Sequence, residues 1–406
     1  MKMRIPILRL LNPILFALFI YNCSEDPLVS NLDHSGLTIN TLTIDNISAQ
    51  NYSVAPNLGT NESLYLGTKN GLNIPVSFIE IANNAYWSYG FDSTILIDSL
   101  HFITYSKDSL LSQNSTPNLF FSPDSQFDEN TSTYLDFSTF SNLDWVDLDQ
   151  PLLKTNNDTS GNYLYTELIW GIDTLMESLI DTSDSNLVRS FALQFTNNDS
   201  NYIELFSEEA TTGEKDPKII MYYRKTIESG DSTIIDTTSA TIYSNGDLSI
   251  IDPGEITLSP DVIGLSNGKG LRSIINIPLT EDSLPAGSVI RSAELILNYD
   301  TTITNQTYNV VLDPIDNDSL ALDSNFVYEF DPYEAMGYPY RVSTDTEDGK
   351  CILSVKEIMQ NISLGNVTNL GFKLISNEKN DPFETIWFDT GESTTSARLE
   401  IIYVTN

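Results

Sequence analysis

Residues 292–299 read Ser-Ala-Glu-Leu-Ile-Leu-Asn-Tyr, and small or apolar side chains alternate with polar ones over part of this stretch. Residues 397–404 alternate in much the same way. A period of two is typical of antiparallel strands with one face in water. Asn-Gly pairs, which favour tight hairpin turns, stand between such runs at 70–71, 245–246 and 267–268. The chain is therefore predicted to be all-β, built from sandwiches or barrels.

Two apolar stripes at helical spacing interrupt the strand pattern and indicate a repeat. They are Ile172, Leu175, Met176 and Leu179, and then Val355, Ile358, Met359 and Ile362. Each stripe predicts one short helix, and each is followed by an apolar strand and later by a closing strand. We therefore expect two homologous domains, at 41–226 and 236–406, with a polar linker at 227–235. The weakly patterned stretch 107–165 is predicted to be an insertion in the first domain.

The order of these pieces resembles the DNRLRE (disaggregatase-related) β-sandwich domains, which overlap with a family of carbohydrate-binding modules. Val289–Leu297, Asn369–Leu374 and Arg398–Tyr403 carry the resemblance. The first copy departs from it, because Ser99-Leu100 replaces Ser-Ala and Lys218 replaces the arginine. The resemblance implies two tandem jelly-roll-like antiparallel sandwiches, each with one short helix, in an extracellular setting. It carries no catalytic motif.

Charge and composition exclude several classes of function. The 406 residues include 20 Lys and Arg against 56 Asp and Glu, which gives a formal net charge of −36. Such a chain repels the phosphates of nucleic acids and anionic lipid surfaces. Two cysteines and two histidines rule out a disulfide-rich scaffold and a cysteine-based zinc site. Hydrophobic residues make up 40% of the chain, which is enough for packed cores.

Residues 1–22 are predicted to be a signal peptide of the lipoprotein type. The segment has a basic start and a short apolar core at 14–21, and Cys23 follows it directly. Asn12 and Pro13 interrupt the apolar run, so a stable membrane span is not expected. Cys23 is the predicted lipidation site, and the alternative is an ordinary signal peptide followed by a chance cysteine.

The residues after Cys23 predict a tether and a location. The stretch 23–40 is polar and fits a flexible tether. Ser-Glu-Asp at 24–26 resembles the acidic tag that directs some bacterial lipoproteins to the outer face of the outer membrane. We therefore expect a lipid-anchored protein that faces the cell exterior and contacts the membrane through its lipid only. Cys351 is then an unpaired thiol, expected to be a small buried hydrophobe.

No pattern of residues predicts an enzyme. The chain has no Gly-x-Ser-x-Gly elbow, phosphate loop or His-Glu-x-x-His helix. Pairs of acids such as Glu208 and Glu209 are expected by chance among 56 acids, and surface carboxylates are the simpler interpretation. His101 lies on an expected core strand, where a structural role is favoured. The protein is therefore predicted to be non-enzymatic.

Aromatic residues in loops are the candidate sugar-binding residues, because sugar rings stack on flat aromatic faces. The candidates are Tyr86, Trp87, Tyr89, Trp145, Tyr338 and Tyr340. The alternative for 86–89 is a loop packed onto the edge of the sandwich.

A structural calcium ion is the one possible cofactor, because calcium prefers oxygen ligands. The candidate ligands are Asp313, Asp316, Asp318 and Asp323. The alternative is a solvated acidic loop.

These observations predict a cell-surface lipoprotein that binds a polysaccharide or glycan. The alternative is a structural or adhesive envelope protein that engages a protein partner. An open aromatic-lined groove would favour the glycan. A long exposed hydrophobic strand edge would favour the protein partner.

Overall fold

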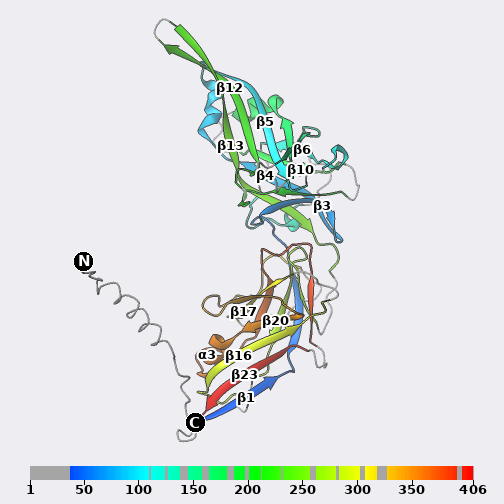
Figure 1. Cartoon of the computed structure of the whole chain (residues 1–406), viewed down its shortest axis with the longest axis vertical. Helices are drawn as coiled ribbons and strands as arrows, with labels where there is room; N and C mark the ends of the chain where they lie inside the picture. Colours follow the sequence, from blue (N-terminus) through cyan, green and yellow to red (C-terminus); the bar gives the residue numbers. More distant parts are fainter. Residues whose placement is uncertain are drawn as a thin grey trace, which may run out of the picture.

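The computed structural model describes residues 37–108, 111–123, 127–137, 145–157, 164–180, 187–196, 201–211, 213–229, 232–256, 262–279, 283–301, 307–317, 327–390 and 396–405. The predicted all-β class is confirmed, because strands dominate these residues and the helices are short. Figure 1 shows two lobes along the long axis of the molecule. We call residues 56–252 the first lobe, and residues 37–55 with 262–405 the second lobe.

The first lobe contains eleven hydrogen-bonded strands in the order β13-β12-β5-β11-β3-β4-β10-β6-β7, with β9 beside β5 and β8 beside β9. The strands are β3 (Ser63–Lys69), β4 (Leu72–Ile81), β5 (Ile95–Ser106), β6 (Asn118–Ser122), β7 (Val146–Asp147), β8 (Leu152–Asn157), β9 (Leu164–Gly171), β10 (Ser190–Gln194), β11 (Tyr202–Phe206), β12 (Lys218–Ser229) and β13 (Ser232–Asp252). The short helices are η2 (Ala85–Phe91), η3 (Gln113–Ser115), η4 (Tyr134–Asp136), η5 (Asp173–Leu175) and α2 (Met176–Ile180).

The second lobe is a sandwich of a four-stranded and a six-stranded sheet, with orders β1-β23-β16-β20 and β18-β2-β15-β21-β17-β19, plus the pair β14-β22. Its elements are β1 (Thr38–Ile44), β2 (Ser48–Val54), β14 (Val262–Leu265), β15 (Leu271–Asn276), β16 (Val289–Asn298), β17 (Asn309–Pro314), β18 (Val327–Tyr328), β19 (Val342–Asp345), β20 (Lys350–Ser354), α3 (Lys356–Ser363), β21 (Phe372–Ser376), β22 (Ile386–Asp389) and β23 (Arg398–Thr405). Leu295 and Phe372, from opposite sheets, lie in one buried cluster. Cys351 is fully buried in that cluster and has no disulfide partner among the described residues.

The two lobes share one pattern of strand pairing. In the first lobe β3 pairs β11, β4 pairs β10, and β5 pairs both β9 and β12. In the second lobe β14 pairs β22, β15 pairs β21, and β16 pairs both β20 and β23. The register even shifts at the same place, skipping Asp98 in β5 and Arg291 in β16. The two apolar helical stripes lie at equivalent positions, just after β9 and β20.

A buried hydrogen-bond motif is also common to both lobes. Ser77 on β4 donates to the carbonyl of Tyr65, and the Tyr65 amide donates to Ser249 Oγ at 2.8 Å. In the second lobe, Ser273 on β15 donates to the carbonyl of Gly264 at 3.0 Å, and the Gly264 amide donates to Asn51 Oδ1 at 3.0 Å. Because buried backbone groups need partners, this motif ties three neighbouring strands together in each lobe.

The structure differs from the sequence at the expected linker. Residues 226–229 pair with residues 232–235 in the hairpin β12-β13, so the chain turns back onto the first lobe. The second half of β13 then pairs β4. In the second lobe the corresponding places, beside β23 and β15, are taken by β1 and β2. The strands that precede the first lobe therefore complete the second lobe. Periodicity predicts a strand but does not specify the sheet edge it joins.

No helix within the described ranges has the length and apolar character needed to cross a membrane.

Candidate functional site

The aromatic loop in the first lobe is packed inward. Asn84 caps η2 by accepting a hydrogen bond from the Tyr86 amide, and the following turn places Trp87 in the core, where it is 0% exposed. The Trp87 indole donates to the Ala82 carbonyl at 3.1 Å, and the guanidinium of Arg189 lies 4.5 Å from its ring centroid. A ring with no exposed face cannot stack on a sugar, so this candidate is excluded. The loop instead packs on the sandwich edge.

The neighbouring tyrosines are also used in packing. Tyr86 and Tyr89 are half-buried, with their ring centroids 5.3 Å apart in an edge-to-face arrangement. Tyr89 meets Tyr223 at 5.0 Å in the same way. These edge-to-face pairs extend the core cluster of the first lobe.

The remaining aromatic candidates divide into covered and exposed rings. Trp145 is half-buried and lies 5.7 Å from the ring of Phe78. Tyr340 is half-buried against the core of the second lobe. Tyr338 is 94% exposed. Of the six candidates, Tyr338 alone has a ring that is open to solvent.

The aspartate loop does not form the expected calcium site in its described part. The side chain of Asp313 is 2% exposed, and its Oδ2 atom lies 3.5 Å from Arg341 Nε. Burial raises the pKa of Asp313, although the positive charge of Arg341 opposes that shift. Asp316 is exposed, and Asp318 and Asp323 lie outside the described residues. The guanidinium of Arg341 therefore lies beside the buried carboxylate of Asp313, where a metal ion was expected.

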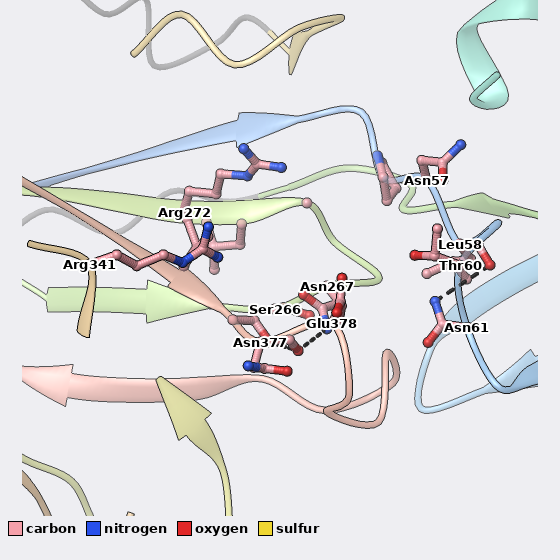
Figure 2. A pocket seen from close by; sticks show the side chains of 15 residues that line it. Asn57, Leu58, Thr60, Asn61, Ser266, Asn267, Arg272, Arg341, Asn377 and Glu378 are labelled. Carbon is pink, nitrogen blue, oxygen red and sulfur yellow. Dashed lines mark hydrogen bonds between the residues drawn. The ribbon is translucent and has the colours of Figure 1, made fainter. Parts of the chain in front are cut away.

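A polar cavity of about 280 Å³ lies where the two lobes meet (Figure 2). Its lining comes from three stretches, within 56–61, 266–272 and 375–378, and from Arg341. We call it the junction pocket. Residues 56–61 connect β2 to β3, so the pocket is built on the segment that leads from the second lobe to the first.

Some polar groups of the junction pocket already form hydrogen bonds or ion pairs within the protein. Asn267 Nδ2 donates to the Asn377 carbonyl at 2.7 Å. Asn57 Nδ2 donates to the carbonyls of Glu129 and Ser132 at 2.9 and 2.8 Å. Arg272 forms an ion pair with Asp331. These bonds hold the walls in place, because each joins segments distant in sequence.

Other polar groups of the pocket remain for a ligand. The side chain of Arg341 is 53% exposed, and its Nε atom lies 3.5 Å from Asp313 Oδ2. Glu378 is exposed and belongs to no ion pair within the described ranges. Figure 2 shows both side chains on the same side of the connecting segment. The pocket thus offers a strong donor and a strong acceptor.

A second cavity of about 440 Å³ adjoins the junction pocket. The two share Thr60, Asn61 and Glu378 in their linings. The second cavity also has Tyr65 and the ion pair of Lys107 with Glu204, at 2.8 Å, in its wall. Together they form a polar groove along the junction of the lobes.

The far end of the first lobe carries a hairpin with exposed isoleucines (Figure 1). β5 pairs β12 only as far as Lys225, and beyond that residue β12 and β13 pair with each other. Ile227 and Ile234 face each other across the hairpin and are 41% and 51% exposed. Ile235 is 63% exposed. These three isoleucines lie among polar residues on a strand pair beyond the edge of the sandwich.

The sequence did not predict the residues of the junction pocket, because they come together only through pairing of distant strands. Arg272 and Arg341, for example, are 69 positions apart in the sequence and meet only in the lining of the folded pocket.

Comparisons with family models, with curated proteins and with solved structures found no match.

Proposed function

We propose that this chain is a non-enzymatic, extracellular glycan-binding protein, and that the junction pocket holds the saccharide. The observation that supports the proposal is that the exposed side chains of Arg341 and Glu378 both line the junction pocket. Sugar hydroxyls both donate and accept hydrogen bonds, so they match a mixed polar lining. Kinship with the DNRLRE and carbohydrate-binding-module domains is part of the same proposal.

The size and lining of the pocket support a small polar ligand. Sites for drug-like molecules are mostly apolar, with volumes of roughly 300–1,000 Å³. The junction pocket, at about 280 Å³, is smaller and is lined mainly by asparagine, arginine and other polar residues. A single sugar unit within a longer chain is the occupant we propose, with neighbouring units along the groove.

Binding of a polysaccharide panel to the mature chain tests the proposal, measured by calorimetry. Glu378→Ala is expected to weaken binding at least about tenfold, the equivalent of 1.4 kcal/mol, without changing the thermal unfolding curve. Tyr338→Ala is the matched control, because its ring is exposed and outside the pocket lining. Loss of binding in the control, with none in Glu378→Ala, would move the site to Tyr338. Equal affinity in all three proteins would reject both sites.

A protein partner at the envelope is a second candidate function, and the exposed isoleucines of the β12-β13 hairpin favour it. Exposed strand edges pair readily with another chain. Ile235→Asp is expected to abolish binding to a purified envelope partner while leaving the fold intact. Ile352→Asp is the control, since Ile352 is 47% exposed on β20 in the other lobe. Equal partner binding by wild type and Ile235→Asp would reject this role for the hairpin.

Attachment through a lipid on Cys23 and placement on the outer face of the bacterial outer membrane remain proposals that the sequence supports. Cys23→Ala is expected to move the protein from the membrane fraction to the soluble fraction. Continued tight association of Cys23→Ala with membranes would contradict the lipid anchor.

A further inference from the structure

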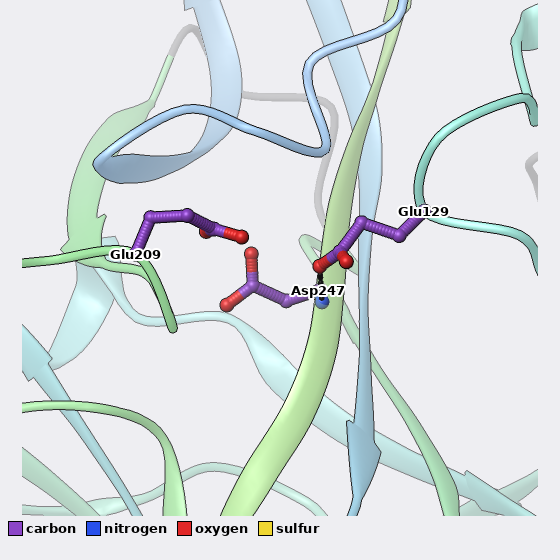
Figure 3. Close-up of side chains that lie close together, drawn as sticks. All are labelled: Glu129, Glu209 and Asp247. Carbon is purple, nitrogen blue, oxygen red and sulfur yellow. Dashed lines mark hydrogen bonds between the residues drawn. The ribbon is translucent and has the colours of Figure 1, made fainter.

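Three carboxylates meet in the first lobe (Figure 3). Glu129 comes from the loop after β6, Glu209 from the turn after β11, and Asp247 from β13. One oxygen from each carboxylate lies within 4.8 Å of the other two. None of the ion pairs in the described part of the chain involves these residues. The cluster therefore concentrates negative charge with no ion-pair partner among the described residues.

Asp247 is the residue that makes this cluster unusual. It is 1% exposed, and its Oδ2 atom accepts a hydrogen bond from the Glu208 amide at 2.7 Å. Its Oδ1 atom is buried and has no hydrogen-bond partner, and the same is true of Glu209 Oε2. Figure 3 shows the Asp247 carboxylate pointing toward that of Glu209. An unpartnered buried carboxylate oxygen is costly, so its presence points to a missing partner.

Burial and mutual repulsion also act on the protonation of the cluster. Burial, with the charge of Glu209 as the next cause, raises the pKa of Asp247 well above its ordinary value. Burial likewise raises the pKa of Glu209 to about 7 and raises that of Glu129. Three charges this close need either protons or a cation to neutralise them.

The surrounding backbone holds the carboxylates in position. The Asp247 amide donates to Glu129 Oε1 at 2.7 Å, and Asn57 donates to the Glu129 carbonyl. Gly59 packs so closely that a Cβ atom there would lie 2.0 Å from that carbonyl oxygen. The loop that carries Glu129 is therefore fixed to the first lobe, and the cluster is organised before any ligand binds.

We propose that Glu129, Glu209 and Asp247 form a calcium-binding site. Calcium takes oxygen ligands at 2.3–2.6 Å, so oxygens on opposite sides of the ion are about 4.6–5.2 Å apart. The three carboxylate oxygens lie within 4.8 Å of one another, close enough for all of them to contact one ion. Three protein carboxylates favour calcium over magnesium, which usually keeps several waters and binds through one or two carboxylates. All the protein donors are hard carboxylate oxygens, which suit calcium better than a thiol- or imidazole-seeking metal.

The bound ion would join three parts of the first lobe. It would link the inserted loop at Glu129, the turn at Glu209 and the long strand β13. Glu209 also lines the second cavity of the polar groove, so the ion would stiffen one wall of that groove. The inference stands apart from the glycan proposal, because it is read out by stability and metal binding alone.

Calcium chloride added to the chelator-treated mature chain tests the site. We expect one ion per chain by calorimetry and a saturable rise of several degrees in the unfolding temperature, since a ligand that binds only the folded state stabilises it. Magnesium at the same concentration is expected to give a clearly smaller rise. An equal response to both ions would overturn the assignment to calcium, and no response would overturn the site.

Variants locate the site. Glu209→Gln and Asp247→Asn are expected to abolish the calcium-dependent rise. Glu208→Gln is the matched control. Glu208 is exposed and adjacent to Glu209, and its substitution removes the same charge. Glu209→Gln keeps the test decisive if Asp247→Asn fails to fold, because Glu209 lies nearer the surface. A calcium response that survives in Glu209→Gln, or that is lost in Glu208→Gln, would contradict the site.

Discussion

Equivalent positions on one sheet face carry apolar side chains in the first lobe and mostly polar or charged side chains in the second lobe. Ser77 pairs Ser249 and Leu193, while Ser273 pairs Asn51 and Leu374, which aligns the lobes residue by residue. The adjacent positions on the outer face are Val76, Phe78, Ala192 and Ile250 in the first lobe, and Arg272, Ile274, Lys373 and Tyr52 in the second. Three of the four positions change from apolar to polar or charged.

Each face is covered by a segment of matching chemistry. In the first lobe, the rings of Phe127, Phe137 and Trp145 lie 5.5, 5.1 and 5.7 Å from Phe78. In the second lobe, Asp331 accepts from Lys373 at 3.0 Å and from the Tyr52 hydroxyl at 3.2 Å, besides its ion pair with Arg272. The pairing pattern and the buried serine are thus common to the lobes, whereas the covering segment and the face beneath it vary together.

Removing β1 and β2 should have the largest effect on this comparison. A chain that starts at Pro56 retains all eleven strands of the first lobe but exposes the edges of β23 and β15. We expect the first lobe to fold and the second to remain unfolded, as measured by hydrogen exchange. A peptide of residues 37–55 should restore protection in the second lobe. Native protection in both lobes without the peptide would contradict the conclusion that β1 and β2 complete the second lobe.

Asp331→Ala should have the next largest effect. It leaves Lys373, whose side chain is 9% exposed, and Arg272 without their shared carboxylate. Breaking a buried ion pair costs about 3–5 kcal/mol of unfolding free energy, measurable by chemical denaturation. The triple variant Asp331→Ala, Arg272→Val and Lys373→Ala copies the first lobe and should recover most of the loss. A triple variant as unstable as the single one would show that the faces are not interchangeable.

Ser77→Ala and Ser273→Ala should have similar, smaller effects. Both hydroxyls are fully buried and occupy equivalent positions in the shared motif. Each substitution should cost about 1–3 kcal/mol of unfolding free energy, because it leaves a buried carbonyl without that donor. Chemical denaturation of the two variants provides the measurement. A large effect in one lobe and none in the other would mean that only one lobe depends on the motif.

The pH dependence of the second lobe should show the smallest effect. Burial alone would raise the pKa of Asp331, but the charges of Arg272 and Lys373 outweigh it and hold that pKa below its usual range. The ionised Asp331 carboxylate contributes fully to stability above the ordinary aspartate pKa of about 3.9. This contribution is lost as the pH falls through the lower pKa that Asp331 has in the folded protein. The stability advantage of wild type over Asp331→Asn should therefore shrink as the pH falls below the ordinary aspartate pKa of about 3.9. An unchanged advantage would contradict this assignment.

The class of fold and the positions of the helices were predictable because periodicity is a local property. Ile172, Leu175 and Leu179 are buried, as their spacing predicts. The partner of β13 was not predictable, because the alternating pattern of a strand does not specify which sheet edge it joins. Trp87 was misplaced because one asparagine cap turns its loop inward. Glu209 was taken for a surface acid, since its neighbours Glu129 and Asp247 are far away in sequence.

The completion of the second lobe by β1 and β2 also determines how long these two strands lack their partners during synthesis. β1 and β2 leave the ribosome before the other described strands, yet β15, the partner of β2, is completed only at Asn276, and β23, the partner of β1, is completed only at Thr405, about 360 residues after β1. At roughly 5–20 residues per second, that delay is on the order of 20–70 s. During it the first lobe can close with its own β13, while two unpaired strands wait with free edges open to wrong pairing. A chaperone that shields these strands would raise the yield of folded protein more than one that acts on the first lobe.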